Sequence, residues 1–179
     1  MTRFVSFLRA INVGGHTVTM AELRALFESL GLQQVETFIA SGNVIFESPS
    51  KDASALERKI QDHLAKSLRY EVATFIRTAA EVGAIARHVS VKASQVEAAT
   101  AVNVGFVADP LEAKAKSALL GLKSAIDDFH VHGREVYWFC KKKQSESRFS
   151  NVVFERTLKT RATWRGLNTV VKLAAKYPG

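Results

Sequence analysis

Residues 3–23 read RFVSFLRAINVGGHTVTMAEL, and this stretch sets the fold class because a strand, a glycine turn and a capped helix follow one another directly. Residues 3–9 are apolar enough for a central strand. Thr19 and Glu22 have the spacing of a capping box, in which the hydroxyl and the carboxylate each accept a backbone hydrogen bond at the start of a helix. The three/four spacing of the apolar residues that follow predicts a helix over 20–30. This succession indicates a domain that packs helices on a sheet.

The remaining sequence extends this pattern and then begins to repeat it. In the first half we expect strands over 35–40, 43–47 and 71–77 and helices over 52–68 and 79–88. The resulting β-α-β-β-α-β order is that of a split β-α-β, or ferredoxin-like, unit. In the second half we expect strands over 102–108, 129–132 and 135–140 and helices over 109–122, 150–158 and 164–175. We therefore predict an α+β fold of two ferredoxin-like (split β-α-β) halves, pseudo-duplicated, over 1–89 and 101–179 with a polar connector over 90–100.

Composition excludes several classes of protein. Cys140 is the single cysteine among 179 residues, so an intramolecular disulfide and a thiolate-ligated structural zinc site are both excluded. No apolar run approaches the ~18 residues of a membrane-spanning helix, and no signal-peptide pattern is present. We expect a cytoplasmic protein that has no membrane partner and no cofactor, and the sequence does not set its oligomeric state.

The net charge of +8 resides in the C-terminal part of the chain. Residues 1–132 hold 14 basic and 14 acidic residues, whereas residues 133–179 hold 11 basic residues and 3 acidic ones, which accounts for the whole surplus. A local positive field favours anionic partners such as nucleic acid, a nucleotide or an acidic protein surface. The alternative is a solvated basic surface with no partner.

The glycine turn over 9–15 is the first candidate for a binding site. Gly14 and Gly15 permit positive φ angles and allow backbone amides to approach an anion near the start of a helix. Arg9 and Asn12 lie at the strand end and in the turn, where open α/β sheets bind ligands. The spacing matches neither a Walker loop nor a dinucleotide-binding fingerprint, and a Gly-Gly pair also serves as an ordinary turn.

Two further segments carry polar residues. Ser41 and Asn43 flank a glycine that we expect to form a tight hairpin between two strands, and the turn alone accounts for these residue types. The segment 161–172 places arginines, a hydroxyl group and the start of a helix together, which suits a phosphate or carboxylate. The alternative there is a capped terminal helix on a basic surface. The candidate ligand-binding residues are Arg9, Asn12, Gly14, Gly15, Ser41, Asn43, Arg161, Thr163, Arg165, Asn168 and Lys172.

Catalytic and metal-binding patterns are weak. His130 and His132 are two apart on an expected strand and share a face, but no third ligand has metal spacing, so we predict no metal site. Cys140 ends an apolar strand and reads as a packed thiol rather than a nucleophile. The ordinary hydrolase motifs are absent, so the sequence does not decide whether the protein is an enzyme.

The motifs RAINVGG at 9–15, MAEL at 20–23, TFIASGNVIF at 37–46 and RATWRGLNTVVKL at 161–173 resemble those of the bacterial family called domain of unknown function 1697. The resemblance covers nearly the whole chain and implies an α+β fold with two ferredoxin-like halves, without implying an activity. Its motif positions are polar, glycine and basic residues. We therefore expect the three segments to converge on one cleft that binds an anionic ligand, either nucleic acid or a phosphate-bearing small molecule. The alternative is an enzyme acting on a phosphorylated or carboxylated small molecule.

Overall fold

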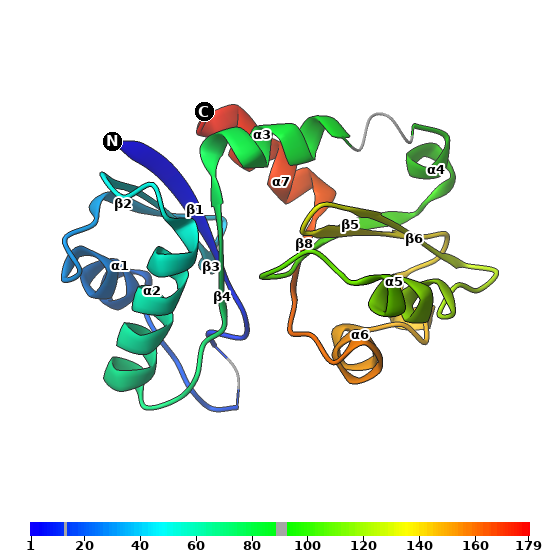
Figure 1. Ribbon diagram of the computed structural model, residues 1–179, viewed down its shortest axis with the longest axis horizontal. Coiled ribbons are helices and arrows are strands. Elements are labelled where there is room, and N and C mark those ends of the chain that lie inside the picture. The colour runs from blue at the N-terminus through cyan, green and yellow to red at the C-terminus, as the bar shows by residue number, and fades with distance from the viewer. Residues whose placement is uncertain (13, 89–92) are drawn as a thin grey trace. The chain divides into compact units, whose positions relative to one another are not determined.

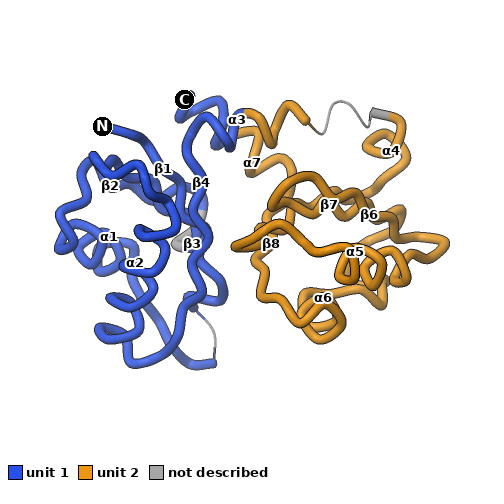
Figure 2. The backbone as a smooth tube through the Cα atoms, in the orientation of Figure 1, with its two compact units in different colours: residues 1–83, 173–179 blue, residues 84–172 orange. Residues whose placement is uncertain are grey.

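The structure, a computed structural model, describes residues 1–12, 14–88 and 93–179. The chain forms two compact units, made of residues 1–83 with 173–179 and of residues 84–172 (Figure 2). Each unit contains one four-stranded sheet with helices. The predicted α+β fold in two similar halves is confirmed.

The first unit has the predicted β-α-β-β-α-β order. Its elements are β1 (Thr2–Leu8), α1 (Met20–Glu28), β2 (Gln33–Phe38), β3 (Ala40–Ser48), α2 (Ala53–Leu68) and β4 (Thr74–Thr78), followed by α3 (Ala79–His88). The strands lie in the order β2-β3-β1-β4, and every neighbouring pair is antiparallel. Figure 1 shows α1 and α2 together on one face of this sheet. The opposite face carries the alternate side chains of the same strands.

The second unit repeats this topology. Its elements are β5 (Ala101–Phe106), α5 (Ala113–Leu120), β6 (Asp127–His132), β7 (Glu135–Cys140), α6 (Asn151–Leu158) and β8 (Thr163–Gly166), in the antiparallel order β6-β7-β5-β8. Three further elements are α4 (Ala93–Ala98) before β5, the short 3-10 turn η2 (Gln144–Glu146) after β7, and α7 (Leu167–Lys176) after β8. The predicted connector 90–100 therefore contains α4, while residues 89–92 lie outside the described residues.

Local sequence rules account for the first helix. The Glu22 amide donates to Thr19 Oγ1 at 3.1 Å, and the Thr19 amide donates to Glu22 Oε2 at 2.8 Å, which is the predicted capping box. Leu23 and Phe27, both on the predicted apolar stripe, are fully buried in the core of the first unit. Burying a side chain of this size stabilises a fold by roughly 1.5–3 kcal/mol, so the stripe fixes which face of α1 meets the sheet.

The predicted hairpin over 41–43 is wrong in position. The chain reverses at Ile39, which has a φ of 64°, and Phe38 pairs with Ala40 across the turn. Residues 41–43 consequently belong to β3, and Asn43 pairs with Phe7 of β1. The Ser-Gly pair is a common turn signal, but here strand pairing places the turn before it.

Two helix starts in the second half also differ from the prediction. The helix expected from residue 109 begins at Ala113, with Glu112 as its N-cap residue and no side-chain cap hydrogen bond. The helix expected over 164–175 begins at Leu167, because residues 163–166 form β8 and pair with β5. Pairing with a neighbouring strand overrides the local helical pattern there.

Candidate functional site

The predicted glycine turn joins β1 to the segment before α1. Ala10, Gly14 and Gly15 all have positive φ angles, of 56°, 61° and 81°, so the backbone turns through the left-handed region as the glycines suggested. Asn12 has a structural role here, because its Oδ1 accepts a 2.7 Å hydrogen bond from the Val18 amide. Val13 lies outside the described residues. The turn is built as predicted, while its ligand remains a prediction.

The partial positive charge at the N-terminus of α1 does not help this turn to bind an anion. The Glu22 carboxylate occupies this N-terminus, since its oxygen accepts the Thr19 amide at 2.8 Å. Hydrogen bonds from the backbone and then the side chain of Thr19 lower the pKa of Glu22 below its usual value. An ionised carboxylate at the first turn of a helix disfavours a second anion there. Any anion at the glycine turn must therefore rely on the loop amides and on Arg9.

Asn43 lies at the same end of the sheet as the glycine turn, because it pairs with Phe7 near the end of β1. Its side chain is buried and its Nδ2 donates to the Phe38 carbonyl at 3.1 Å, which holds the turn at Ile39. The side chain of Ser41, which we also predicted, lies outside the described residues. The structure thus brings Asn43 near the turn and gives it a structural partner.

In the second unit, Arg165 is the most constrained of the predicted residues. It is half-buried on β8, and its Nη1 donates to Thr163 Oγ1 and to the Trp164 carbonyl, both at 2.8 Å. Loss of water around the guanidinium lowers the pKa of Arg165 to about 10. The group stays charged at neutral pH, and a poorly solvated charge attracts an anion more strongly than one in water does.

A pocket of about 370 Å³ surrounds the start of α7. The residues that line it come from α4, β5, η2 and the junction of β8 with α7, and they are Val96, Ala99, Thr100, Ala101, Val102, Asn103, Gln144, Gly166, Leu167 and Asn168. None of the lining residues is charged. Asn168 was predicted from the sequence, and it is exposed at the first turn of α7.

Three carboxamide side chains of this pocket make no hydrogen bond within the described part of the chain: those of Asn103, Gln144 and Asn168. Each carboxamide offers two N–H donors and one acceptor oxygen. Thr100, by contrast, donates its hydroxyl to the Lys141 carbonyl at 2.8 Å. The first amides of a helix also lack acceptors within the helix, so hydrogen-bond donors from the side chains and from α7 meet at one place.

Sequence reasoning identified only Asn168 of these three. Asn103 interrupts an otherwise apolar strand, and a polar residue inside such a strand is a signal that could have been used. Gln144 lies in η2, between two segments that showed no motif, and its place in the pocket depends on how β7 connects to α6.

Of the other predicted residues of the second unit, Arg161 and Lys172 are exposed, and Thr163 is buried with its hydroxyl bonded to Arg165. Overall, Arg9, Asn12, Gly14, Gly15, Ser41 and Asn43 belong to the first unit, and Arg161, Thr163, Arg165, Asn168 and Lys172 belong to the second. Their convergence on one cleft stays a prediction.

The histidines of β6 form a small cluster. His130 and His132 both stack on His88 of α3, with ring centroids 5.2 Å and 3.8 Å apart, and the Nε2 atoms of His88 and His130 lie 2.9 Å apart. Over residues 1–12, 14–88 and 93–179, no group of three histidine, cysteine or acidic side chains could hold a metal ion. Cys140 is fully buried, and burial raises the pKa of its thiol, as a packed thiol requires.

The fold and pockets define an α+β protein of two units with one shared topology. The chain belongs to the family described as "Protein of unknown function (DUF1697)", whose model matches residues 1–137. It is also similar to the solved structure of the conserved bacterial protein SP0830 from Streptococcus pneumoniae, with 22% sequence identity, a TM-score of 0.68 and 97% of each chain covered. At that identity the likeness shows the fold alone. No curated protein matches the chain, and no helix in its described residues is long and apolar enough to cross a membrane.

Proposed function

We propose that this protein binds an anionic, phosphate-bearing ligand at the pocket around the start of α7. The observation that carries the proposal is the set of three carboxamides, on Asn103, Gln144 and Asn168, whose side chains make no hydrogen bond within the described residues. Unpaired donors beside a helix N-terminus suit phosphate oxygens, because each oxygen accepts several hydrogen bonds.

The charge distribution supports an anion in preference to a neutral ligand. No acidic side chain lines the pocket, and Lys141, Lys142 and Lys143 directly precede Gln144 and are exposed. Residues 133–179 as a whole hold 11 basic residues and 3 acidic ones. Such a local surplus raises the concentration of anions near the surface and accelerates their association.

The source of the phosphate is either nucleic acid or a small molecule. We also infer that both units are ferredoxin-like, from their β-α-β-β-α-β order and their sheets. Four-stranded sheets of this type include RNA-binding ones, yet a shared fold does not assign a function. Salt dependence separates the two sources, because binding that neutralises several backbone phosphates weakens steeply with salt.

The test compares three forms of the protein. They are the wild type, the double variant with Gln144→Ala and Asn168→Ala, and the control variant Gln33→Ala at an exposed residue of β2. Thermal shift with inorganic pyrophosphate and nucleotides, and anisotropy with single-stranded RNA and DNA, measure binding. Losing hydrogen bonds to a charged group costs about 1.5–3 kcal/mol each, so the double variant should bind at least about ten-fold more weakly. Absence of a response to every probe, or equal binding by all three forms, contradicts the proposal.

The proposal extends to the predicted residues of the first unit, which are tested separately. Arg9→Ala removes the cation at the end of β1 without touching the capping box at Thr19. If Arg9 contacts the ligand, this variant binds the same probes more weakly, whereas an unchanged affinity contradicts a role for Arg9.

A further inference from the structure

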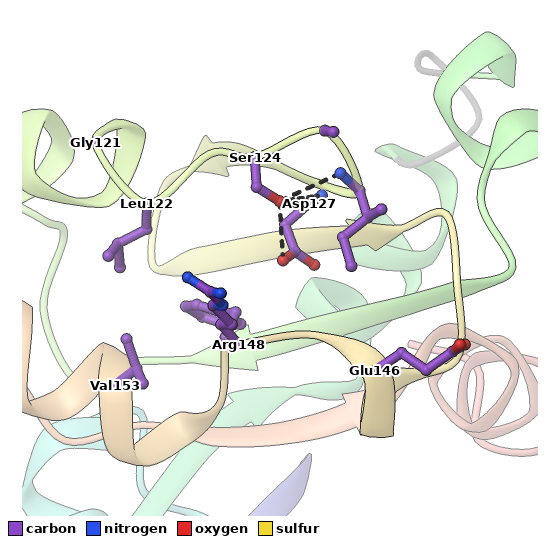
Figure 3. A pocket seen from close by; sticks show the side chains of 10 residues that line it. Gly121, Leu122, Ser124, Asp127, Glu146, Arg148 and Val153 are labelled. Carbon is purple, nitrogen blue, oxygen red and sulfur yellow. Dashed lines mark hydrogen bonds between the residues drawn. The ribbon is translucent and has the colours of Figure 1, made fainter.

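A second pocket in the second unit is larger and chemically different. Its volume is about 480 Å³, which is within the range of small-molecule sites. It lies between the end of α5, the start of β6 and the start of α6 (Figure 3), and is lined by Gly121, Leu122, Ser124, Ala125, Ile126, Asp127, Glu146, Arg148, Phe149 and Val153. It shares no lining residue with the pocket around α7.

Most of the pocket wall is apolar and one part of it is rigid. Leu122, Ile126 and Val153 are half-buried, and Phe149 is 5% exposed. The Phe149 ring packs against Phe129 at 4.7 Å and against Trp138 at 4.8 Å between ring centroids. A wall held by such aromatic contacts is formed before a ligand arrives.

Asp127 lines the pocket but is fully engaged by the protein. Its carboxylate accepts hydrogen bonds from Trp138 Nε1 at 2.8 Å, Ser147 Oγ at 2.6 Å and Ser124 Oγ at 3.3 Å. Asp127 as a whole is only 4% exposed to solvent. These neutral donors satisfy the carboxylate, so Asp127 does not need the nearby cation Arg148 as a partner.

Arg148 is the cation of this pocket, and it forms no hydrogen bond or ion pair with any residue that the structure describes. Its nitrogen atoms lie between Leu122 and Asp127 in the view of Figure 3, whereas the side chain of Glu146 extends away at the other end. Glu146 Oε2 accepts the Lys143 amide at 3.2 Å, which stabilises η2. The guanidinium therefore retains its paired donors for an external group.

We propose that this pocket binds a small monocarboxylate with an apolar chain or ring. The carboxylate pairs with Arg148 through two parallel N–H···O hydrogen bonds, which the planar guanidinium is shaped to form. The apolar body lies against Leu122, Ile126, Phe149 and Val153. This site is separate from the phosphate site of the proposed function and does not depend on it.

The test uses probes of one shape and different charge: hydrocinnamate, its amide, and phenylpropylamine. Amide chemical shifts of the isotope-labelled protein measure both the affinity and the location of each probe. We expect hydrocinnamate to shift the amide signals of residues of this pocket, and we expect the amide to bind at least about ten-fold more weakly, since a charge-assisted hydrogen-bonded pair is stronger than a neutral one. Preferential binding of the amine instead assigns recognition to Asp127 and Glu146 and overturns the proposal.

Matched variants locate the contact. Arg148→Gln should weaken hydrocinnamate binding by about ten-fold or more, while Arg156→Gln, at an exposed arginine of α6 outside the pocket, should leave it unchanged. Val153→Thr keeps the side-chain shape but makes one wall polar, and should weaken binding a few-fold. The site is rejected by any one of three results. These are equal affinities for the amide and the carboxylate, the same effect from both arginine variants, and no binding of any probe.

The two proposals fail separately. Arg148→Gln should leave the response to pyrophosphate unchanged, and Gln144→Ala with Asn168→Ala should leave hydrocinnamate binding unchanged. If one set of variants removes both responses, the two pockets are not independent sites and the carboxylate proposal is rejected.

Discussion

Arg77 and Arg165 occupy the same position in the two sheets. Arg77 on β4 lies opposite Val5 of β1, and Arg165 on β8 lies opposite Val104 of β5. The strands β4 and β8 are each the last in the strand order of their sheet, and β1 and β5 are their neighbours, so the two pairs occupy equivalent positions. Each also donates from Nη1 to the carbonyl of the residue before it, at 2.9 Å and 2.8 Å. The two halves are therefore related residue by residue at this edge of the sheet.

Their surroundings differ in the degree of burial. Arg77 is fully buried, whereas Arg165 is half-buried. A guanidinium in either position loses hydration when the chain folds, and this loss opposes stability unless other groups compensate it.

We predict that Arg165→Met changes the free energy of unfolding by less than about 1 kcal/mol. Burial lowers the pKa of Arg165 to about 10, so the charged form is poorly solvated in the folded protein. Removing the charge relieves that cost and offsets the loss of the hydrogen bonds to Thr163 and to the Trp164 carbonyl, as for other buried charges replaced by apolar residues. Urea denaturation measures the change, with the exposed Arg156→Met as the control; a loss above about 2 kcal/mol contradicts the prediction.

We predict that Gly105→Ala destabilises the second unit by about 1–3 kcal/mol. A Cβ atom at this position would lie 2.8 Å from the indole ring of Trp164, which pairs with Gly105 across β5 and β8. The ring cannot easily move, because its Nε1 donates to Asn151 Oδ1 at 2.8 Å and its centroid lies 5.4 Å from that of Phe154.

The control for that variant is Gly166→Ala on β8, where a Cβ atom meets nothing within 4 Å. Its free energy of unfolding should be within about 0.5 kcal/mol of that of the wild type. Equal effects of the two alanine variants rule out the close approach of Trp164 as the cause.

Cys140 should react slowly with thiol reagents in the folded protein. Its side chain is fully buried, and burial raises the pKa of the thiol, so the reactive thiolate is scarce at neutral pH. Labelling with a thiol-reactive dye, followed by mass spectrometry, should become fast only in urea. Rapid labelling without denaturant shows instead that this end of β7 opens readily.

Stability should decrease as the pH rises above about 10, the pKa of a tyrosine in an unfolded chain. Burial raises the pKa of Tyr70, Tyr137 and Tyr177, most strongly for Tyr137. The unfolded chain then loses phenolic protons that the folded chain retains, so it binds fewer protons and the free energy of unfolding decreases with pH. This contribution is fully present below about pH 10 and is lost as the folded phenols ionise.

Denaturation curves at several alkaline pH values measure this slope. Tyr137→Phe removes the largest of the three contributions, so the slope above about pH 10 should become shallower. A slope that Tyr137→Phe leaves unchanged indicates that the phenol ionises equally well in the folded and unfolded chains. Lysines, which ionise in the same range, are common to both proteins and cancel in the comparison.

The sequence by itself determined what depends on residues close together in the chain. The capping box of Thr19 and Glu22, the stripe of Leu23 and Phe27 and the alternation of strands and helices follow from local hydrogen bonding and from periodic burial. These rules were sufficient for the α+β class and for the order of elements up to β8, whereas the family was indicated by the quoted motifs.

Tertiary structure alone decided what depends on pairing between distant segments. It made residues 163–166 a strand because β5 offered an edge, and it placed the turn at Ile39 ahead of the Ser-Gly pair. It also brought Asn103, Gln144 and Asn168 to one pocket and set Arg148 against an apolar wall. Side chains that converge from separate strands, turns and helices share no local spacing, so only the folded chain identifies them as a site.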